Sequence, residues 1–169
     1  MRRFFSFPNP VNEVSARLVA GGVVALCALT LATRQPLLLV PLCYGFWARV
    51  LTGPKLSPLG QVVTRVVTPR LGIDRPTAGP PKRFAQGMGA AMSSAAVVSA
   101  FVVGSTGAAW VFVSMILFAA SLESFLGVCL GCTIFGLLMR AGVIPASVCE
   151  ECNDITARLA ARRREQATA

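Results

Sequence analysis

The run ARLVAGGVVALCALTLAT (residues 16–33) decides the fold class, because Arg17 is its only charged residue. A transmembrane helix needs about 20 predominantly apolar residues, so this run is long enough to cross a bilayer. The polar sequence TRQP (residues 33–36) follows it and predicts a tight turn. Further apolar runs cover residues 36–51, 84–103 and 110–139. The pattern predicts an all-α polytopic membrane protein with a four-helix transmembrane bundle.

Composition supports this class and narrows the chemistry. Of the 169 residues, 54% are hydrophobic and 14% are charged, whereas soluble domains carry about 25% charged residues. The chain contains no histidine, which excludes Ser-His-Asp triads, Cys-His dyads and histidine-ligated metals. Cysteine is therefore the most plausible reagent in any chemistry that the chain performs by itself.

The last apolar run is too long for one span at ordinary tilt. Gly127 and Gly131 lie in it and are expected to break the helix there. Residues 133–143 are then expected to run along the membrane interface or to tilt back into it.

Basic residues predict the orientation. Arg2, Arg3 and Arg17 accompany the first span, and the connection of residues 52–83 holds six more basic residues: Lys55, Arg65, Arg70, Arg75, Lys82 and Arg83. The short connections on the other side hold only Arg34. Since basic loops stay in the cytosol, both termini are predicted to be cytosolic.

The predicted organisation has five parts. A cytosolic segment (1–15) precedes a first transmembrane hairpin (16–51) and a basic cytosolic or interfacial connection (52–83). A second hairpin (84–145) carries a C-x-x-C pair at its rim, and a cytosolic helix with a basic tail (146–169) completes the chain. Within the connection, SPLGQVVTRVVTPRL (57–71) fits either a short interfacial helix held at anionic lipid head groups or an ordered loop. No nucleic-acid partner is expected.

A stripe of small residues predicts helix packing. Gly87, Ala91, Ala95 and Ser99 recur every fourth residue in the third span. Small residues let transmembrane helices approach closely. This stripe is therefore expected to face a neighbouring helix.

Four of the six cysteines form two C-x-x-C pairs, Cys129/Cys132 and Cys149/Cys152. Their spacing, C-x2-C-x16-C-x2-C, falls in the range of four-cysteine zinc sites. The pairs also suit thiol–disulfide or persulfide exchange, since cytosolic thiols are kept reduced. A third interpretation is that the thiols are inert. The isolated Cys27 and Cys43 are expected to be packing residues.

Glu123 is the only acidic residue deep in a span, and intramembrane acids are costly and usually functional. An ion pair with Arg17, Arg49 or Arg83 at the cytosolic ends of the helices is the expected arrangement, with proton transfer as the alternative. On a straight helix Glu123 would point away from Cys129 and Cys132, so contact with them requires a break near Gly127.

Several longer stretches resemble one bacterial family. They are FPNPVNEVSARLVA (7–20), GPKLSPLGQVVTRVVTPRL (53–71), GPPKRFAQGMG (79–89) and LESFLGVCLGCTIFGLLMRAGVIP (122–145). The order and wording of these motifs resemble domain-of-unknown-function family 4395, which is common in actinobacteria. Its signature maps onto Glu123, Gly127, Cys129, Gly131 and Cys132. The resemblance implies a bacterial plasma (inner) membrane location and neighbouring genes for thioredoxin-like and rhodanese-like proteins.

The leading hypothesis is a membrane thiol component, with no enzymatic activity assigned. Cys129 and Cys132 would exchange electrons or sulfane sulfur with a soluble thioredoxin-like or rhodanese-like partner, and Cys149 and Cys152 would pass thiol equivalents on. One alternative is a non-enzymatic scaffold in which all four cysteines bind zinc. Another is a small transporter for a sulfur compound or other solute.

Overall fold

The computed structural model describes residues 10–73, 75–145 and 148–149. Four of its helical stretches are long and apolar enough to cross a membrane: Glu13–Thr33, Pro36–Leu71, Gly79–Phe101 and Thr106–Leu126. The chain is therefore an all-α helical membrane protein, as predicted.

The first hairpin is defined by its capping residues. Helix α1 (Glu13–Thr33) begins after Asn12, whose side chain accepts a hydrogen bond from the Val14 N–H at 2.9 Å. It ends at Arg34, which adopts the left-handed conformation with φ 50°, as residues after a helix often do. A 3₁₀ turn η1 (Pro36–Leu38) then leads into α2 (Leu39–Thr52).

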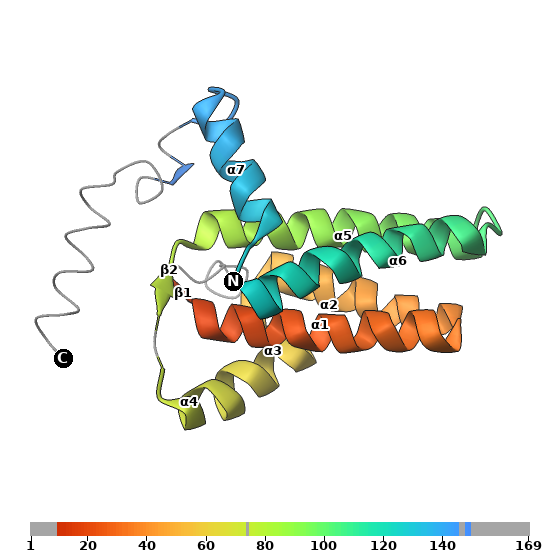
Figure 1. Ribbon diagram of the computed structural model, residues 1–169, viewed down its shortest axis with the longest axis horizontal. Helices are drawn as coiled ribbons and strands as arrows, with labels where there is room; N and C mark the ends of the chain where they lie inside the picture. The colour runs from red at the N-terminus through yellow and green to blue at the C-terminus, as the bar shows by residue number, and fades with distance from the viewer. Residues whose placement is uncertain (1–9, 74, 146–147, 150–169) are drawn as a thin grey trace, which may run out of the picture.

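The connection after α2 is helical rather than a loop. A 3₁₀ turn η2 (Gly53–Lys55) precedes α3 (Pro58–Val62), a π-helical turn η3 (Val63–Val67) and α4 (Thr68–Leu71). Val63 is buried, whereas Val62, Val66 and Leu71 are exposed. The Ser15 and Thr68 hydroxyls lie 2.8 Å apart and join this segment to α1, beneath which it lies in Figure 1.

A two-residue antiparallel ladder joins β1 (Val11–Asn12) to β2 (Pro76–Thr77), with Val11 opposite Thr77. The end of the bundle where this ladder lies is called here the sheet end. Helix α5 (Gly79–Phe101) starts there, five residues before the predicted start at residue 84. Pro80 and Pro81 lie in its first turn, where proline lacks only an N–H that would be unpaired anyway.

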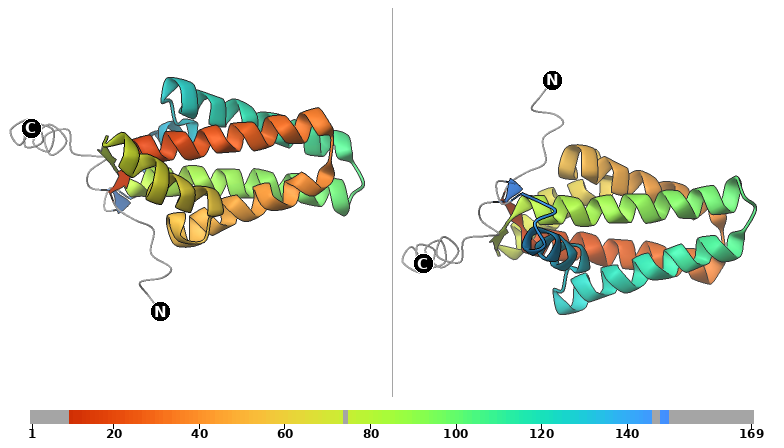
Figure 2. Two further views of the ribbon diagram at one scale, coloured as in Figure 1. Left: turned by 90° about the horizontal axis from the view of Figure 1, so that it is seen from below. Right: turned by 90° about the horizontal axis from the view of Figure 1, so that it is seen from above.

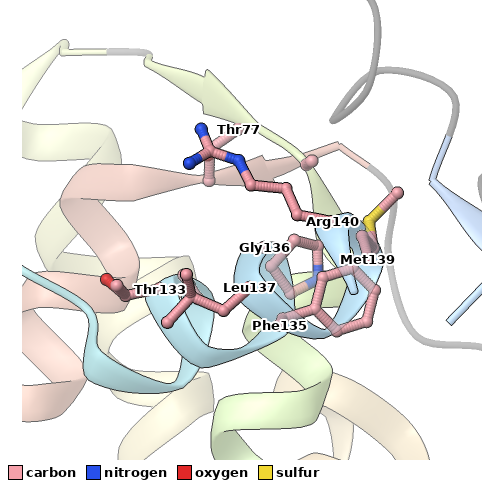
Figure 3. Close-up of a pocket in the computed structure, with 10 residues that line it drawn as sticks. Thr77, Thr133, Phe135, Gly136, Leu137, Met139 and Arg140 are labelled. Carbon is pink, nitrogen blue, oxygen red and sulfur yellow. The ribbon is translucent and has the colours of Figure 1, made fainter. Parts of the chain in front are cut away.

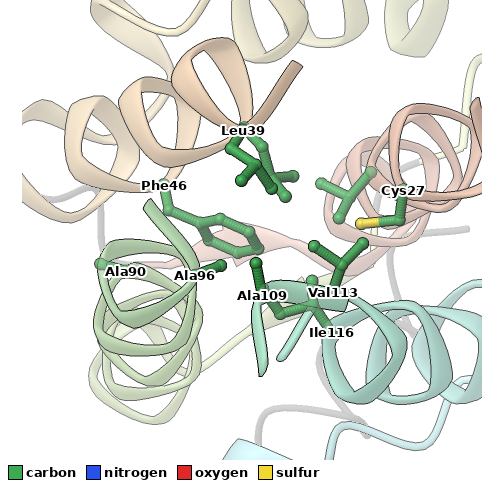
Figure 4. Packing of buried hydrophobic residues seen from close by; sticks show 10 residues of the cluster. Cys27, Leu39, Phe46, Ala90, Ala96, Ala109, Val113 and Ile116 are labelled. Carbon is green, nitrogen blue, oxygen red and sulfur yellow. The ribbon is translucent and has the colours of Figure 1, made fainter. Parts of the chain in front are cut away.

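The second hairpin is α5 with α6 (Thr106–Ser121) and the π-helical turn η4 (Leu122–Leu126). Helix α5 packs against α2 and α6, and α1 packs against α6 and α2, so the four helices form a closed bundle (Figures 1 and 2). Side chains from all four fill its centre (Figure 4). The buried cluster comprises Val23, Cys27, Leu39, Leu42, Phe46, Ala90, Ala96, Ala109, Val113 and Ile116.

The small-residue contact on α5 differs from the predicted stripe. Ala91 is exposed, and a Cβ at Gly87 would meet no neighbouring atom within 4 Å. Gly89 instead lies against the Phe46 ring of α2, and Ser93 and Ala96 continue the buried face. The prediction was wrong because α5 carries small residues on more than one face, and only the position of α2 selects between them.

Gly89→Ala should destabilise the protein, whereas Gly87→Ala should not. A Cβ at residue 89 enters the space of the Phe46 ring, and overpacking costs about 1–3 kcal/mol. A Cβ at residue 87 meets nothing. Thermal unfolding in detergent, followed by tryptophan fluorescence, measures both. Equal midpoints for the two variants would contradict the α2–α5 packing.

Candidate functional site

The helix that carries Glu123 breaks at the predicted glycine. The π-helical turn η4 ends at Gly127, which is left-handed with φ 70°. The Arg17 guanidinium of α1 donates to the carbonyls of Phe125 at 3.1 Å and Ser124 at 3.4 Å. The last carbonyls of a helix lack partners within it, so Arg17 stabilises the break.

Helix α7 (Leu130–Arg140) begins directly after the break and leaves the bundle at a steep angle at the sheet end (Figure 1). Gly131 and Phe135 are two of the residues through which it packs on α5. A Cβ at Gly131 would lie 2.5 Å from the Cα and the Cβ of Ala85, so only glycine permits this approach. One turn later the buried Phe135 ring lies 5.6 Å from that of Phe84. The first turn of α7 is therefore held tightly against α5.

The Cys129/Cys132 pair forms the start of α7. Cys129 is the N-cap residue, and its Sγ accepts a hydrogen bond from the Cys132 N–H at 3.3 Å. The Cys132 thiol also donates to the Cys129 Sγ at 2.7 Å. Both thiols are free. Cys129 is buried, whereas Cys132 is partly exposed.

These contacts shift the pKa values of the two thiols in opposite directions. The pKa of Cys129 is lowered, chiefly because its thiolate accepts the Cys132 S–H; burial and the Glu123 charge oppose this shift, while the Lys82 charge supports it. The pKa of Cys132 is raised, chiefly because its proton is held in that hydrogen bond, with burial as the second cause. The pair therefore loses its first proton easily and retains the second, a pattern typical of C-x-x-C thiols at helix N-termini.

Glu123 forms an ion pair with Lys82, whose Nζ lies 2.6 Å from Oε1. The predicted arginine partners were therefore wrong. Because α5 starts at Gly79, Lys82 lies in its first turns and points into the bundle rather than belonging to a loop. The prolines before Lys82 could have indicated the earlier helix start. A lysine–carboxylate pair offsets the cost of placing each charge in a span.

The predicted arginines have other roles. Arg49 is buried, donates to the Gln86 Oε1 at 2.7 Å and the Ser57 Oγ at 3.4 Å, and lies 4.7 Å from the centre of the Phe46 ring. Arg83 donates to the Val50 carbonyl at 3.1 Å. Both residues connect α5 to the α2 region, and Lys82 is the ion-pair partner of Glu123.

The other cysteines lie apart from this pair or outside the described residues. Cys27 belongs to the buried core and Cys43 lies 3.5 Å from the Ser94 hydroxyl, as expected for packing residues. Cys149 is buried, and Cys152 lies outside the described residues. In the described ranges, 10–73, 75–145 and 148–149, no cluster of three Cys, Asp or Glu side chains could hold a metal ion. The four-cysteine zinc site therefore stays a prediction.

A cavity of about 370 Å³ opens beside the pair, between α7 and the segment from β2 to the start of α5 (Figure 3). Sequence reasoning missed it. Its lining residues are Thr77, Ala78, Pro81, Cys132, Thr133, Phe135, Gly136, Leu137, Met139 and Arg140. Of the two cysteines, Cys132 is the one that faces this cavity.

One family profile, described as Domain of unknown function (DUF4395), matches residues 11–140. The chain belongs to the DUF4395 family. The matched DUF4395 region includes Glu123 and the Cys129/Cys132 pair and ends before Cys149, so the first pair lies in the family domain and the second does not. No curated protein and no solved structure matches the chain.

Removing the Cys132 thiol should raise the pKa of Cys129. In Cys132→Ala the thiolate loses the S–H donor that is the main cause of its lowered pKa. The fraction of Cys129 ionised at neutral pH should therefore fall several-fold. Thiolate absorbance near 240 nm, titrated against pH with Cys129→Ala as the reference, measures this. An unchanged titration curve would contradict the hydrogen bond from the Cys132 thiol to the Cys129 sulfur.

Replacing one partner of the Lys82–Glu123 pair should destabilise the protein more than replacing both partners. Glu123→Gln leaves the poorly exposed ammonium without a counter-charge, and an unpaired buried charge costs about 3–5 kcal/mol. The double variant Lys82→Met/Glu123→Met should recover most of that loss. A double-mutant cycle on thermal stability in detergent tests this, and additive losses would argue against a direct pair.

Proposed function

We propose that this DUF4395 protein is a membrane thiol component in which Cys129 and Cys132 exchange electrons or sulfane sulfur with a soluble partner. The observation that carries the proposal is the pair itself: two free thiols, joined by an S–H···S hydrogen bond at the start of a helix. A thiol pair that ionises once and then holds its second proton is suited to attack followed by resolution.

The proposed location is the cytosolic face of a bacterial inner membrane. The connection of residues 52–83, which includes β2 at the sheet end, carries six basic residues: Lys55, Arg65, Arg70, Arg75, Lys82 and Arg83. The hairpin turns at the other end of the bundle carry only Arg34. The positive-inside rule favours a cytosolic sheet end. The exposed Arg65 and Arg70 on the amphipathic α3–α4 segment suit contact with anionic lipids. A reducing cytosol would keep the pair as thiols at rest.

The exchange reduces one substrate disulfide and forms one disulfide between Cys129 and Cys132. The exchange begins with Cys129 as the thiolate. The Cys132 proton moves to it along their hydrogen bond, and the resulting Cys132 thiolate attacks a substrate disulfide. A mixed disulfide forms and the first substrate thiolate leaves with the proton from Cys129. The Cys129 thiolate then attacks the Cys132 sulfur and expels the second substrate thiolate. The substrate gains two electrons, and the pair becomes a disulfide.

The proposed soluble partner is either a thioredoxin-like protein, which would restore the dithiol, or a rhodanese-like protein, whose persulfide would pass its outer sulfur to a thiolate of the pair and leave as a thiol. A resting dithiol needs a reductant after each exchange, and a soluble dithiol protein supplies two electrons by the same chemistry in reverse. The second pair, Cys149 and Cys152, is a proposed intermediate carrier.

Cys129→Ser should trap the intermediate. Without the resolving thiol, the mixed disulfide on Cys132 persists when the anaerobically purified protein meets an oxidised small disulfide. Peptide mass spectrometry locates the adduct, and Cys43→Ser is the matched control because Cys43 is an isolated helical thiol. Wild-type protein and Cys43→Ser should cycle between dithiol and disulfide without accumulating an adduct on Cys132. Absence of both cycling and trapping would overturn the proposal.

Metal content and free-thiol count on the same preparation address the zinc scaffold. The thiol component should contain no stoichiometric metal and should expose a reversible dithiol pair. About one zinc per chain, lost in each of the four Cys→Ser variants at residues 129, 132, 149 and 152, would favour the scaffold.

A further inference from the structure

Three residues on one side of α7 define the cavity beside the thiol pair. Cys132, Gly136 and Arg140 recur every fourth residue, so they lie within about 80° of one another around the helix. Cys132 and Arg140 are about 12 Å apart along its axis. Figure 3 shows the Arg140 side chain extending toward Thr77 on the opposite side of the cavity.

Gly136 keeps the space between these residues open. A Cβ built on it meets no atom within 4 Å, and its φ is not in the left-handed region. The backbone would therefore accept a larger residue, and its side chain would occupy the cavity. The glycine has no conformational reason to be there.

The opposite wall comes from a different part of the chain. Thr77 of β2, Ala78 and Pro81 at the start of α5 face α7 across the cavity. Thr77 and Thr133 add hydroxyl groups that can donate hydrogen bonds. The volume of about 370 Å³ lies within the range of small-molecule sites, about 300–1,000 Å³.

The charge of the cavity is positive. Among the described residues that line it, Arg140 is the charged one and no carboxylate is present. The Arg140 guanidinium makes no ion pair with any residue in the described part of the chain. Arginine recognises carboxylates through two parallel hydrogen bonds.

We infer that this cavity binds a small disulfide that bears a carboxylate, with Arg140 holding the carboxylate and Cys132 meeting the disulfide. The inference rests on the proposed thiol function and names its substrate class. Cys132 attacks one sulfur, the first small thiol leaves with the proton from Cys129, and Cys129 then displaces the second. One disulfide yields two small thiols, and two electrons pass from the cysteine pair to the substrate.

Three disulfides of similar length test the charge preference: dithiodipropionate is anionic, bis(2-hydroxyethyl) disulfide is neutral and cystamine is cationic. The readout is the rate of mixed-disulfide formation at Cys132, in full-length Cys129→Ser protein in detergent. Dithiodipropionate should react about tenfold faster than cystamine. Adding Arg140→Gln should reduce that ratio to near one, chiefly by slowing the reaction with dithiodipropionate. Arg65→Gln, an exposed arginine outside the cavity, should keep the full ratio.

Gly136→Val provides an independent test of the cavity. Its side chain should lower the rate with all three disulfides about tenfold without lowering thermal stability. Equal rates with all three disulfides, or an equal loss of preference in Arg65→Gln and Arg140→Gln, would overturn the assigned substrate class and leave the thiol function standing. If the protein with Gly136 in place reacts with none of the three disulfides, the thiol function itself is overturned.

Discussion

The rest of the site depends on one constraint: a helix that ends within the protein must find partners for its last carbonyls. Arg17 supplies them from α1 by donating to the carbonyls of Ser124 and Phe125. With those groups paired, the chain turns at Gly127 and begins α7 at Leu130, with Cys129 as the N-cap residue. A continuous helix would have carried the cysteines along the span. The break places them at a helix N-terminus, where the Cys132 N–H donates to the Cys129 sulfur.

The second organising feature is the balance of charge around the thiols. Lys82 and Glu123 neutralise each other across α5 and η4, and their charges act on Cys129 in opposite directions. The largest effect on Cys129 is therefore the local one, the hydrogen bond from Cys132. This arrangement lets the ion pair support the bundle while the first turn of α7 sets the thiol chemistry.

Fold class was readable from the sequence because each span has to be apolar over its whole length. The spans, the polar turn at Arg34 and the break at Gly127 all followed from local sequence. The partner of Glu123 and the packed face of α5 did not. Lys82 appeared to belong to a loop, and the Gly87 and Gly89 registers carry equally small residues. In both cases the neighbouring helix, not the local sequence, decided the outcome.

The sequence by itself therefore determined that this chain is a helical membrane protein and that its candidate reactive groups are cysteines. The apolar spans and the glycine break are properties of short stretches of sequence, and the absence of histidine is a property of composition. All three can be read without knowing which residues are in contact. The tertiary structure decided which residues meet. Docking of Gly131 on Ala85 directs Cys132 into a cavity shared with β2, and helix periodicity brings Arg140 to the same side. Such contacts join residues that lie far apart in the sequence, and no local pattern encodes them.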